Sequence, residues 1–377
     1  MKNNCYASAS FGLESIVARE LKELGIENIR VRDARVYFDA DEEEIIKANL
    51  WLRSADRIYI VLGEFRATSF DELYDNIFGI EWQEVLPKDA YISVNGDTVR
   101  STIMSVSDVQ SVTKKAIVSK LKEKYGISFF RENGEEYPVY VSIIRDNVTV
   151  ALNTSGEGLN RRGYRVANLK APIRETLASG IIHISRWSDR PFYDPMCGSG
   201  TIAIEAAMKA KNIAPGLRRK TAIERWNREL EQTAVRLRSE AKASIIEDPE
   251  VLIHASDIDV SCVESAKRNA RKAGVEDIIR FSAGDVRRFR PETEEGTIII
   301  NPPYAIRLNN SKEIDDLYAA IGRIYRKLSG FRLYSICADE DFAEKFGMKE
   351  DSKRKLYNGN IRCYLYQYFK RRENGKE

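Results

Sequence analysis

The sequence predicts an α/β protein with more than one domain. Three observations support this class: short apolar runs alternate with helical patterns along the chain, a glycine-rich turn joins a strand to an apolar helix near residue 198, and a hairpin pattern closes the chain. With 377 residues and a hydrophobic content of 43%, the chain can build two or three cores.

The first 65 residues show strand and helix patterns in the order β-α-β-β-α-β. Apolar residues recur at helical spacing from Leu13 to Leu24, whereas the stretch after Asn28 alternates with period two. This order is typical of a small ferredoxin-like domain, which we expect over residues 1–65. The segment carries no catalytic signature of its own.

Residues 66–154 form a second expected domain. It contains helical patterns at 69–80 and 107–126, a strand pattern at 90–97 and a closing strand pair with a tight turn. The longer helix has a basic face that includes Lys114 and Lys115. That face is either an RNA contact or an ordinary exposed helix face.

A connector is expected at residues 155–170, where the sequence is rich in glycine and arginine and lacks apolar periodicity. Arg161, Arg162 and Arg165 can contact phosphate, and Tyr164 between them can stack on a base. The alternative is a charged hinge without a ligand.

A second basic stretch runs from Lys209 to Ala243 and holds ten basic and four acidic residues. Its first part includes Arg218 and Arg219, and its second part has a helical pattern. Because the whole chain has a net charge of only +3, the location of positive charge is more informative than its sum. The stretch is either a phosphate-contacting surface beside an active site or a solvated helix face.

Residues 171–377 carry the chemistry. Between Arg190 and Ala210 lie a short strand, a turn with Asp194, Gly198 and Gly200, and an apolar helix. Glycines at such a turn let a ligand approach the backbone at the carboxyl end of a strand, where open α/β sheets bind ligands. The turn is not G-x-G-x-x-G and no G-K-S/T follows, so a dinucleotide and a nucleoside triphosphate both fit poorly.

Two later strands end in carboxylates. Asp257 can accept two hydrogen bonds from ribose hydroxyls, and Asp285 is placed to accept one from an adenine amino group. Asp259 is either a second helper or the N-cap of the helix that follows it. Together with the glycine turn, these acids predict a nucleotide-type site.

A fourth strand ends in Asn301, Pro302, Pro303 and Tyr304. An exocyclic base amine is a poor nucleophile because its lone pair is delocalised into the ring. The side-chain oxygen of Asn301 and the carbonyl of Pro302 can accept both amino hydrogens and aim the nitrogen at a methyl donor. Tyr304 offers an aromatic face to a base taken out of its stack. Guanine N2 and adenine N6 both satisfy this pattern.

The composition disfavours other classes of protein. The five cysteines are scattered, show no C-x-x-C spacing and are odd in number, which argues against a disulfide framework and a zinc site. There is no apolar stretch of about 18 residues and no leader pattern. We therefore expect a cytoplasmic protein with neither a membrane nor a metal partner.

The motifs DPMCGSGT, SDID, AGDV and NPPY, in this order, resemble the class I methyltransferases that act on exocyclic amino groups, and the front half resembles their THUMP domain. The segments GLNRRGYR, APIRETLASGII and NIAPGLRRK are similar to those of bacterial THUMP-containing ribosomal RNA guanine-N2 methyltransferases. The resemblance covers nearly the whole chain. It implies a Rossmann-like catalytic domain with a terminal β-hairpin, and S-adenosylmethionine as the methyl donor.

The resemblance also assigns roles to residues. Asp257 would bind the ribose of the donor and Asp285 its adenine, while the APIRETL segment, which contains Glu175, would help to close the pocket. The target base would be held by residues 301–304. The methionine part of the donor would be bound by the glycine turn, that is by Asp194, Cys197, Gly198, Ser199, Gly200 and Thr201.

This chain departs from the family pattern at two places. The family usually has phenylalanine where Met196 stands, and NPPYGER where this chain has NPPYAIR. The first change is an apolar swap. The second alters the loop beside the target base, so it bears on the target more than on the reaction type.

The expected function is methyl transfer from S-adenosylmethionine to N2 of a guanine in large-subunit (23S) ribosomal RNA, with structured RNA as the partner. Adenine-N6 methylation of RNA or DNA and guanine-N2 methylation of tRNA are alternatives. A non-enzymatic RNA-binding assembly factor is a third reading. It predicts decayed motifs, whereas every motif here is intact. The oligomeric state stays open.

Overall fold

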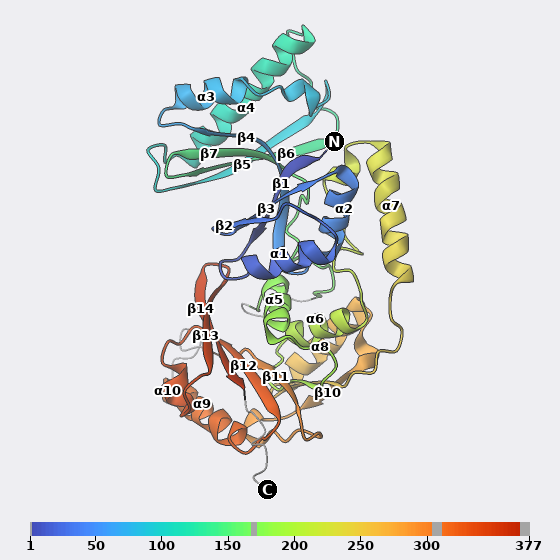
Figure 1. Cartoon of the computed structure of the whole chain (residues 1–377), viewed down its shortest axis with the longest axis vertical. Helices are drawn as coiled ribbons and strands as arrows, with labels where there is room; N and C mark the ends of the chain where they lie inside the picture. The colour runs from blue at the N-terminus through green and yellow to red at the C-terminus, as the bar shows by residue number, and fades with distance from the viewer. Residues whose placement is uncertain (1, 167–171, 304–310, 370–377) are drawn as a thin grey trace.

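The computed structural model describes residues 2–166, 172–303 and 311–369. Within them the chain forms two seven-stranded sheets, one built by the N-terminal half and one by the C-terminal half (Figure 1). No helix of the described part is long and apolar enough to cross a membrane. Tyr304 and the residues after it that differ from the family pattern, Ala305 and Ile306, lie outside the described residues.

The first domain has the predicted β-α-β-β-α-β order. Its strands run in the spatial order β2-β3-β1-β4 with antiparallel pairing, which confirms the ferredoxin-like prediction. Helix α2 begins with a capping box in which Asp41 and Glu44 each accept a backbone N–H of the other residue. The elements are β1 (Asn3–Ala9), α1 (Glu14–Glu23), β2 (Arg30–Arg32), β3 (Arg35–Ala40), α2 (Glu42–Trp51) and β4 (Ala55–Arg66).

The second domain continues the same sheet. Strand β7 pairs antiparallel with β4, so the order becomes β2-β3-β1-β4-β7-β6-β5. The hairpin between β6 and β7 turns at Arg145 and Asp146, whose φ angles of 51° and 64° are those of a type I′ turn. The elements are α3 (Phe70–Phe78), β5 (Tyr91–Val99), α4 (Val106–Tyr125), β6 (Glu136–Ile144) and β7 (Asn147–Asn153), with a short 3₁₀ turn at Trp82–Glu84.

The C-terminal sheet has the strand order β10-β9-β8-β11-β12-β14-β13. Strands β8 to β12 are parallel, and β14 runs antiparallel to β12 and β13, as predicted for a parallel sheet that ends in a hairpin. The strands are β8 (Phe192–Asp194), β9 (Ile253–Asp257), β10 (Ile279–Ala283), β11 (Gly296–Ile300), β12 (Phe331–Cys337), β13 (Ser352–Asn358) and β14 (Ile361–Phe369).

Helices cover both faces of this sheet. Buried residues of α5, α6 and α8 join one core cluster, and those of α9 and α10 join another. The helices are α5 (Glu175–Ser185), α6 (Thr201–Ala210), α7 (Arg228–Ala243), α8 (Val260–Ala273), α9 (Ser311–Tyr325) and α10 (Phe342–Phe346), and the 3₁₀ turns are Ile223–Arg225, Glu276–Ile278 and Val286–Arg288.

Helix α7, which belongs to the C-terminal half of the chain, lies along the N-terminal domain (Figure 1). Its apolar residues share a core with α2, among them Leu230 and Leu237. Just before it, Trp226 stacks on Tyr137 of the second domain, with ring centroids 4.9 Å apart. The basic stretch of the C-terminal half therefore packs against both N-terminal domains. We keep the division of the chain after residues 65, 154 and 170 as a proposal.

Candidate active site

Four strand ends meet at one edge of the C-terminal sheet. Strand β8 ends at Asp194 and β9 at Asp257, while Asp285 follows β10 and Asn301 follows β11. Since β8 lies between β9 and β11, the chain crosses to the other side of the sheet at this point. Such a switch point is where open α/β sheets bind ligands at the carboxyl ends of their strands.

The glycine turn between β8 and α6 is held against β9. The Gly198 N–H donates to Asp257 Oδ2 at 2.9 Å, and the Cys197 N–H donates to the Ser256 carbonyl at 2.9 Å. Gly198 and Gly200 have φ angles of 52° and 82°, which side chains disfavour. A Cβ on Gly198 would meet no atom within 4 Å, so the backbone here is open to a ligand.

Asp194 is buried directly beneath this turn. Neither carboxylate oxygen has a hydrogen-bond partner of good geometry among the described residues. Burial, together with the nearby charge of Asp257, raises the pKa of Asp194 to about 8, although the backbone N–H groups of Met196 and Ala203 act in the opposite direction. A buried carboxylate of this kind is suited to a cationic ligand group that approaches the open glycine.

Asp257 and Asp259 do different things in the structure. The partly exposed carboxylate of Asp257 accepts the N–H groups of Gly198 and Asp259, which orients it along the pocket edge. Asp259 accepts the Ser261 N–H at 2.8 Å and caps α8, the structural alternative that the sequence left open.

A cavity of about 430 Å³ lies between these strand ends and α9. Asp285 lines it, with its carboxylate held by the Arg287 backbone N–H and guanidinium. The hydrogen bond from the Arg287 side chain holds the pKa of Asp285 below its ordinary value. The lining includes Met196, Asp257, Ile258, Asp285, Val286 and Pro303.

Arg165 points into this site rather than toward solvent. Its guanidinium pairs with Glu175 at 2.8 Å and reaches Ser199 Oγ and Thr201 Oγ1, both at 3.3 Å. With its side chain 18% exposed, Arg165 is poorly placed to grip RNA phosphate. We therefore correct its predicted role: Arg165 contacts the glycine turn and pairs with Glu175 beside it.

The strand end that was predicted to hold the base follows β11, the neighbour of β8, and its Pro303 lines the cavity. Pro302 is buried, and the Pro303 carbonyl accepts the Tyr318 hydroxyl at 2.8 Å, which ties the turn to α9. Asn301 is partly buried at the end of β11. The arrangement brings Asn301, Pro302 and Pro303 to the same sheet edge as the acids.

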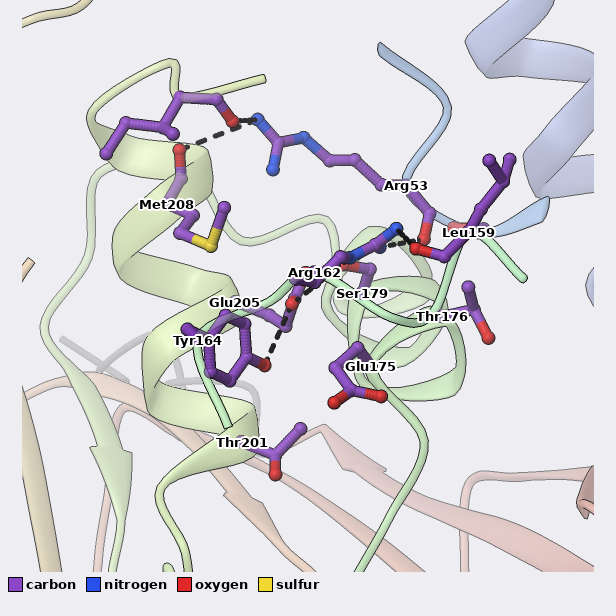
Figure 2. A network of polar contacts seen from close by, with 12 residues as sticks. Arg53, Leu159, Arg162, Tyr164, Glu175, Thr176, Ser179, Thr201, Glu205 and Met208 are labelled. Atoms are coloured by element: carbon purple, nitrogen blue, oxygen red, sulfur yellow. Dashed lines mark hydrogen bonds and ion pairs between the residues drawn. The ribbon is translucent and has the colours of Figure 1, made fainter. Parts of the chain in front are cut away.

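Two other arginines predicted to bind RNA are interior. The side chain of Arg162 is fully buried and pairs with Glu205, which also accepts hydrogen bonds from Tyr164 and Ser179 (Figure 2). Arg219 donates to the carbonyls of Leu159 and Asn49. The predicted RNA contacts of Arg162 and Arg219 are therefore wrong, and so is base stacking on Tyr164. All three side chains are buried and form hydrogen bonds inside the protein.

The remaining cations predicted to bind RNA stay accessible. Arg161, Lys115 and Arg218 are exposed, and Lys114 is partly exposed in an ion pair with Glu132 at 2.9 Å. They lie on separate elements: Lys114 and Lys115 on α4, Arg161 after β7, and Arg218 before α7. Their contact with RNA remains a proposal.

One residue that orders the site was missed by sequence reasoning. Asn269 of α8 donates to the Ser199 carbonyl at 2.9 Å and accepts the Val166 N–H at 2.9 Å. It thus joins the glycine turn to the segment that carries Arg165. An asparagine within a helix pattern gives no signal of such a role, because its partners are 70 and 103 residues away.

Three family models match this chain. The RlmL ferredoxin-like domain matches residues 4–59, the THUMP domain matches residues 67–153, and the RMKL-like methyltransferase domain matches residues 162–367.

Two curated relatives align over nearly the whole chain. YpsC of Bacillus subtilis, named as a candidate RNA methyltransferase, is 42% identical over 374 residues, which are 98% of this chain and 96% of YpsC. The ribosomal RNA large subunit methyltransferase K/L of Shewanella amazonensis is 32% identical over 97% of this chain and 53% of that protein. The chain therefore spans about half the length of the K/L relatives.

Two solved structures are similar along their whole length. SMU.472, a candidate methyltransferase complexed with SAH, has a TM-score of 0.93 at 40% identity, over 98% of this chain and 99% of that one. A Listeria monocytogenes protein described as a predicted N6-adenine-specific DNA methylase has a TM-score of 0.90 at 41% identity, over 98% and 97% of the two chains. Given the matched domain and the likeness to YpsC, this chain belongs to the RMKL-like methyltransferase family.

Proposed function

We propose that this protein transfers a methyl group from S-adenosylmethionine to N2 of a guanine in large-subunit ribosomal RNA. One observation carries the proposal: the glycine turn, Asp257, Asp285 and Asn301 lie at a single sheet edge. Asp257, Asp285 and Pro303 line one cavity there. The proposed donor site and the proposed base-holding turn would then be neighbours, as direct methyl transfer requires.

The donor site fits S-adenosylmethionine, which supplies an electrophilic methyl group on a sulfonium when it is bound. Asp257 would hold its ribose and Asp285 its adenine amino group. The open Gly198 and the buried Asp194 suit the methionine end, whose amino group is cationic. Cys197, Ser199, Gly200 and Thr201 shape the same turn, and Glu175 with Arg165 borders it. The solved structure of SMU.472 with SAH supports this choice of donor.

The base-holding turn supplies acceptors rather than a general base. We propose that Asn301 Oδ1 and the Pro302 carbonyl accept the two amino hydrogens and orient the nitrogen lone pair toward the methyl group. The amine becomes acidic as the new N–C bond forms, so its proton can leave to a backbone oxygen or to water. Pro303 stiffens the turn, and Tyr304 would stack on the extruded base.

The choice of large-subunit ribosomal RNA rests on the relatives, and the choice of guanine rests on the resemblance of the sequence motifs to guanine-N2 methyltransferases. The K/L proteins are named as large-subunit ribosomal RNA methyltransferases, and the matched THUMP and ferredoxin-like domains occupy the front half. Adenine N6 is the second candidate, because the same acceptors fit that amine and the Listeria protein carries that description.

Nucleoside analysis separates the candidates. The protein is incubated with labelled S-adenosylmethionine and total RNA from a strain that lacks the gene, and each RNA size class is digested. We expect N2-methylguanosine in large-subunit ribosomal RNA. N6-methyladenosine would establish the second candidate instead, and the absence of transfer even to precursor ribosomal particles would leave a binding factor.

Asn301→Ala tests the proposed mechanism. The variant loses one of two acceptors that act on the transition state, so methyl transfer should fall by about 100-fold or more. SAH affinity, measured by calorimetry, should change by less than about threefold, because Asn301 is not among the residues proposed to bind the donor. Retention of full activity would remove Asn301 from the mechanism.

A further inference from the structure

An exposed aromatic side chain lies where the N-terminal domain meets the catalytic half. Phe11, in the loop after β1, is 51% exposed. Its ring lies against that of Tyr357, at the end of β13, with centroids 5.9 Å apart and planes tilted by 57°. The two residues are 346 positions apart in sequence, so this pair exists only in the folded molecule.

Strand pairing places Tyr357 beyond the catalytic edge of the sheet. The last residue of β12, Cys337, pairs with Tyr364 of β14. Tyr357 pairs with Arg362, two residues further along the hairpin. At about 3.3 Å per residue, Tyr357 lies roughly 7 Å past the end of β12. Since β12 is the neighbour of β11, this is the edge at which Asn301 lies.

Two cations lie on the hairpin side of the aromatic pair. Lys355 Nζ lies 5.5 Å from the centre of the Tyr357 ring. The Arg174 guanidinium lies over the hairpin turn, 3.4 Å from where a Cβ on Gly359 would be. Both cations are exposed, and neither has a carboxylate within ion-pair distance among the described residues. Arg174 directly precedes Glu175, so this charge borders the donor site as well.

The loop and the hairpin hold each other in place. A Cβ on Gly12 would lie 2.5 Å from the Lys355 carbonyl, so only glycine permits this approach. Arg354 donates to Ser15 Oγ at 2.9 Å across the same junction. Glu14, three residues after Phe11, has its carboxylate engaged by the backbone N–H groups of Gly12 and Ala34. The surface is thus preorganised before any ligand binds.

We propose that Phe11, Tyr357, Lys355 and Arg174 form a stacking platform for an unpaired nucleotide of the RNA strand that carries the target base. An exposed aromatic face takes any base, and the flanking cations suit its phosphates. A base that has left its stack leaves neighbours that need such support. The proposal rests on RNA being the substrate, but it does not depend on which base is methylated.

Binding of a fluorescein-labelled 12-residue oligouridine, followed by fluorescence anisotropy, tests the platform. Oligouridine contains no methylatable amine, so the result is separate from the identity of the methylated base. Phe11→Ala and Tyr357→Ala should each weaken binding by about tenfold, and Phe11→Trp should restore it. Lys355→Ala should weaken binding mainly at low salt, because it removes a phosphate contact.

Phe129→Ala is the matched control, since Phe129 is 72% exposed but follows α4 in the second domain. It should bind oligouridine as the wild type does. Unchanged SAH affinity in every variant shows that each is folded. Equal oligouridine affinity for wild type, Phe11→Ala and Tyr357→Ala, or no binding by any of them, overturns the platform. In another outcome, the variants bind oligouridine more weakly as expected while the wild type forms no N2-methylguanosine. That combination of results would contradict the proposed target base and leave the platform supported.

Discussion

At the residue scale, the charge state of Asp194 makes the stability of the protein depend on pH. Its folded-state pKa of about 8 lies above the ordinary value of 3.8, so the folded protein keeps a proton that the unfolded chain loses between those values. Stability from this group is therefore greatest at the acidic end of the window and falls as the pH rises toward 8. If Asp194 binds the cationic amino group of the donor, as we propose, donor binding needs the ionised form.

Asp194→Asn should separate these two effects. The neutral amide removes the cost of a buried charge, so the variant should be more stable than wild type by at least about 2–4 °C in Tm at pH 8.5, with the gain shrinking toward pH 5. SAH affinity should rise from pH 6 to 8.5 in the wild type and stay low and flat in the variant. A wild-type-like affinity profile for Asp194→Asn would contradict the assignment.

Arg165 offers a second test at this scale. If its guanidinium serves the methionine end of the donor, Arg165→Gln should weaken SAH by about tenfold, the value of one charge-assisted contact. Binding of 5′-methylthioadenosine, which lacks the amino-acid part, should be unchanged. Arg161→Gln is the control and should affect neither ligand. Equal losses for both ligands would mean that Arg165 only supports the fold of the turn.

At the element scale, the glycine turn depends on how closely α8 approaches α6. A Cβ on Gly200, which has a φ of 82°, would come within 2.9 Å of the Ala266 Cβ. Gly126, at the end of α4, has a φ of 64° but would meet no atom within 4 Å. Both glycines have a positive φ that side chains disfavour, but a side chain would clash with a neighbour only at Gly200.

Gly200→Ala should therefore destabilise more than Gly126→Ala. Conformational strain alone costs about 1 kcal/mol at either position, and overpacking at Gly200 adds about 1–3 kcal/mol. Urea unfolding measures both variants. SAH binding should weaken only for Gly200→Ala, because that substitution displaces the turn beneath the donor. Equal free energies of unfolding for the two variants would show that α8 can move away from the new side chain without loss of stability.

At the scale of the whole molecule, two features join the domains. Strands β4 and β7 merge the first two domains into one sheet, and a buried network around Glu205 connects the N-terminal domain to α5 and α6 (Figure 2). Arg162 donates to the Arg53 carbonyl, and Arg53 donates to the Ile213 carbonyl at 2.7 Å. Arg162 and Tyr164, within the segment predicted as a connector, are thus part of the interior.

Neighbouring arginines provide the test. Arg162→Gln leaves the Glu205 charge buried without its partner, which should cost about 3–5 kcal/mol in the free energy of unfolding. Arg161, paired with Glu157 at the surface, should have little effect when replaced by glutamine. Urea unfolding followed by tryptophan fluorescence compares the two. A small effect of Arg162→Gln would show that the network contributes no net stability.

The sequence by itself determined the local elements and the order of the strand ends. Helical and period-two patterns, the hairpin at Arg145 and the glycine turn are encoded within a few residues, so the ferredoxin-like domain, the terminal hairpin and the convergence of Asp194, Asp257 and Asp285 were predictable. The motif order was enough to indicate the family. These features need only neighbours along the chain.

Only the tertiary structure decided which arginines are buried and which sheets merge. In sequence, Arg161, Arg162 and Arg165 look alike, yet one is exposed, one is paired inside the protein and one borders the glycine turn. The Phe11 and Tyr357 pair was equally hidden. The physical reason is that burial of a charge depends on partners brought from distant segments, and local periodicity does not encode those partners.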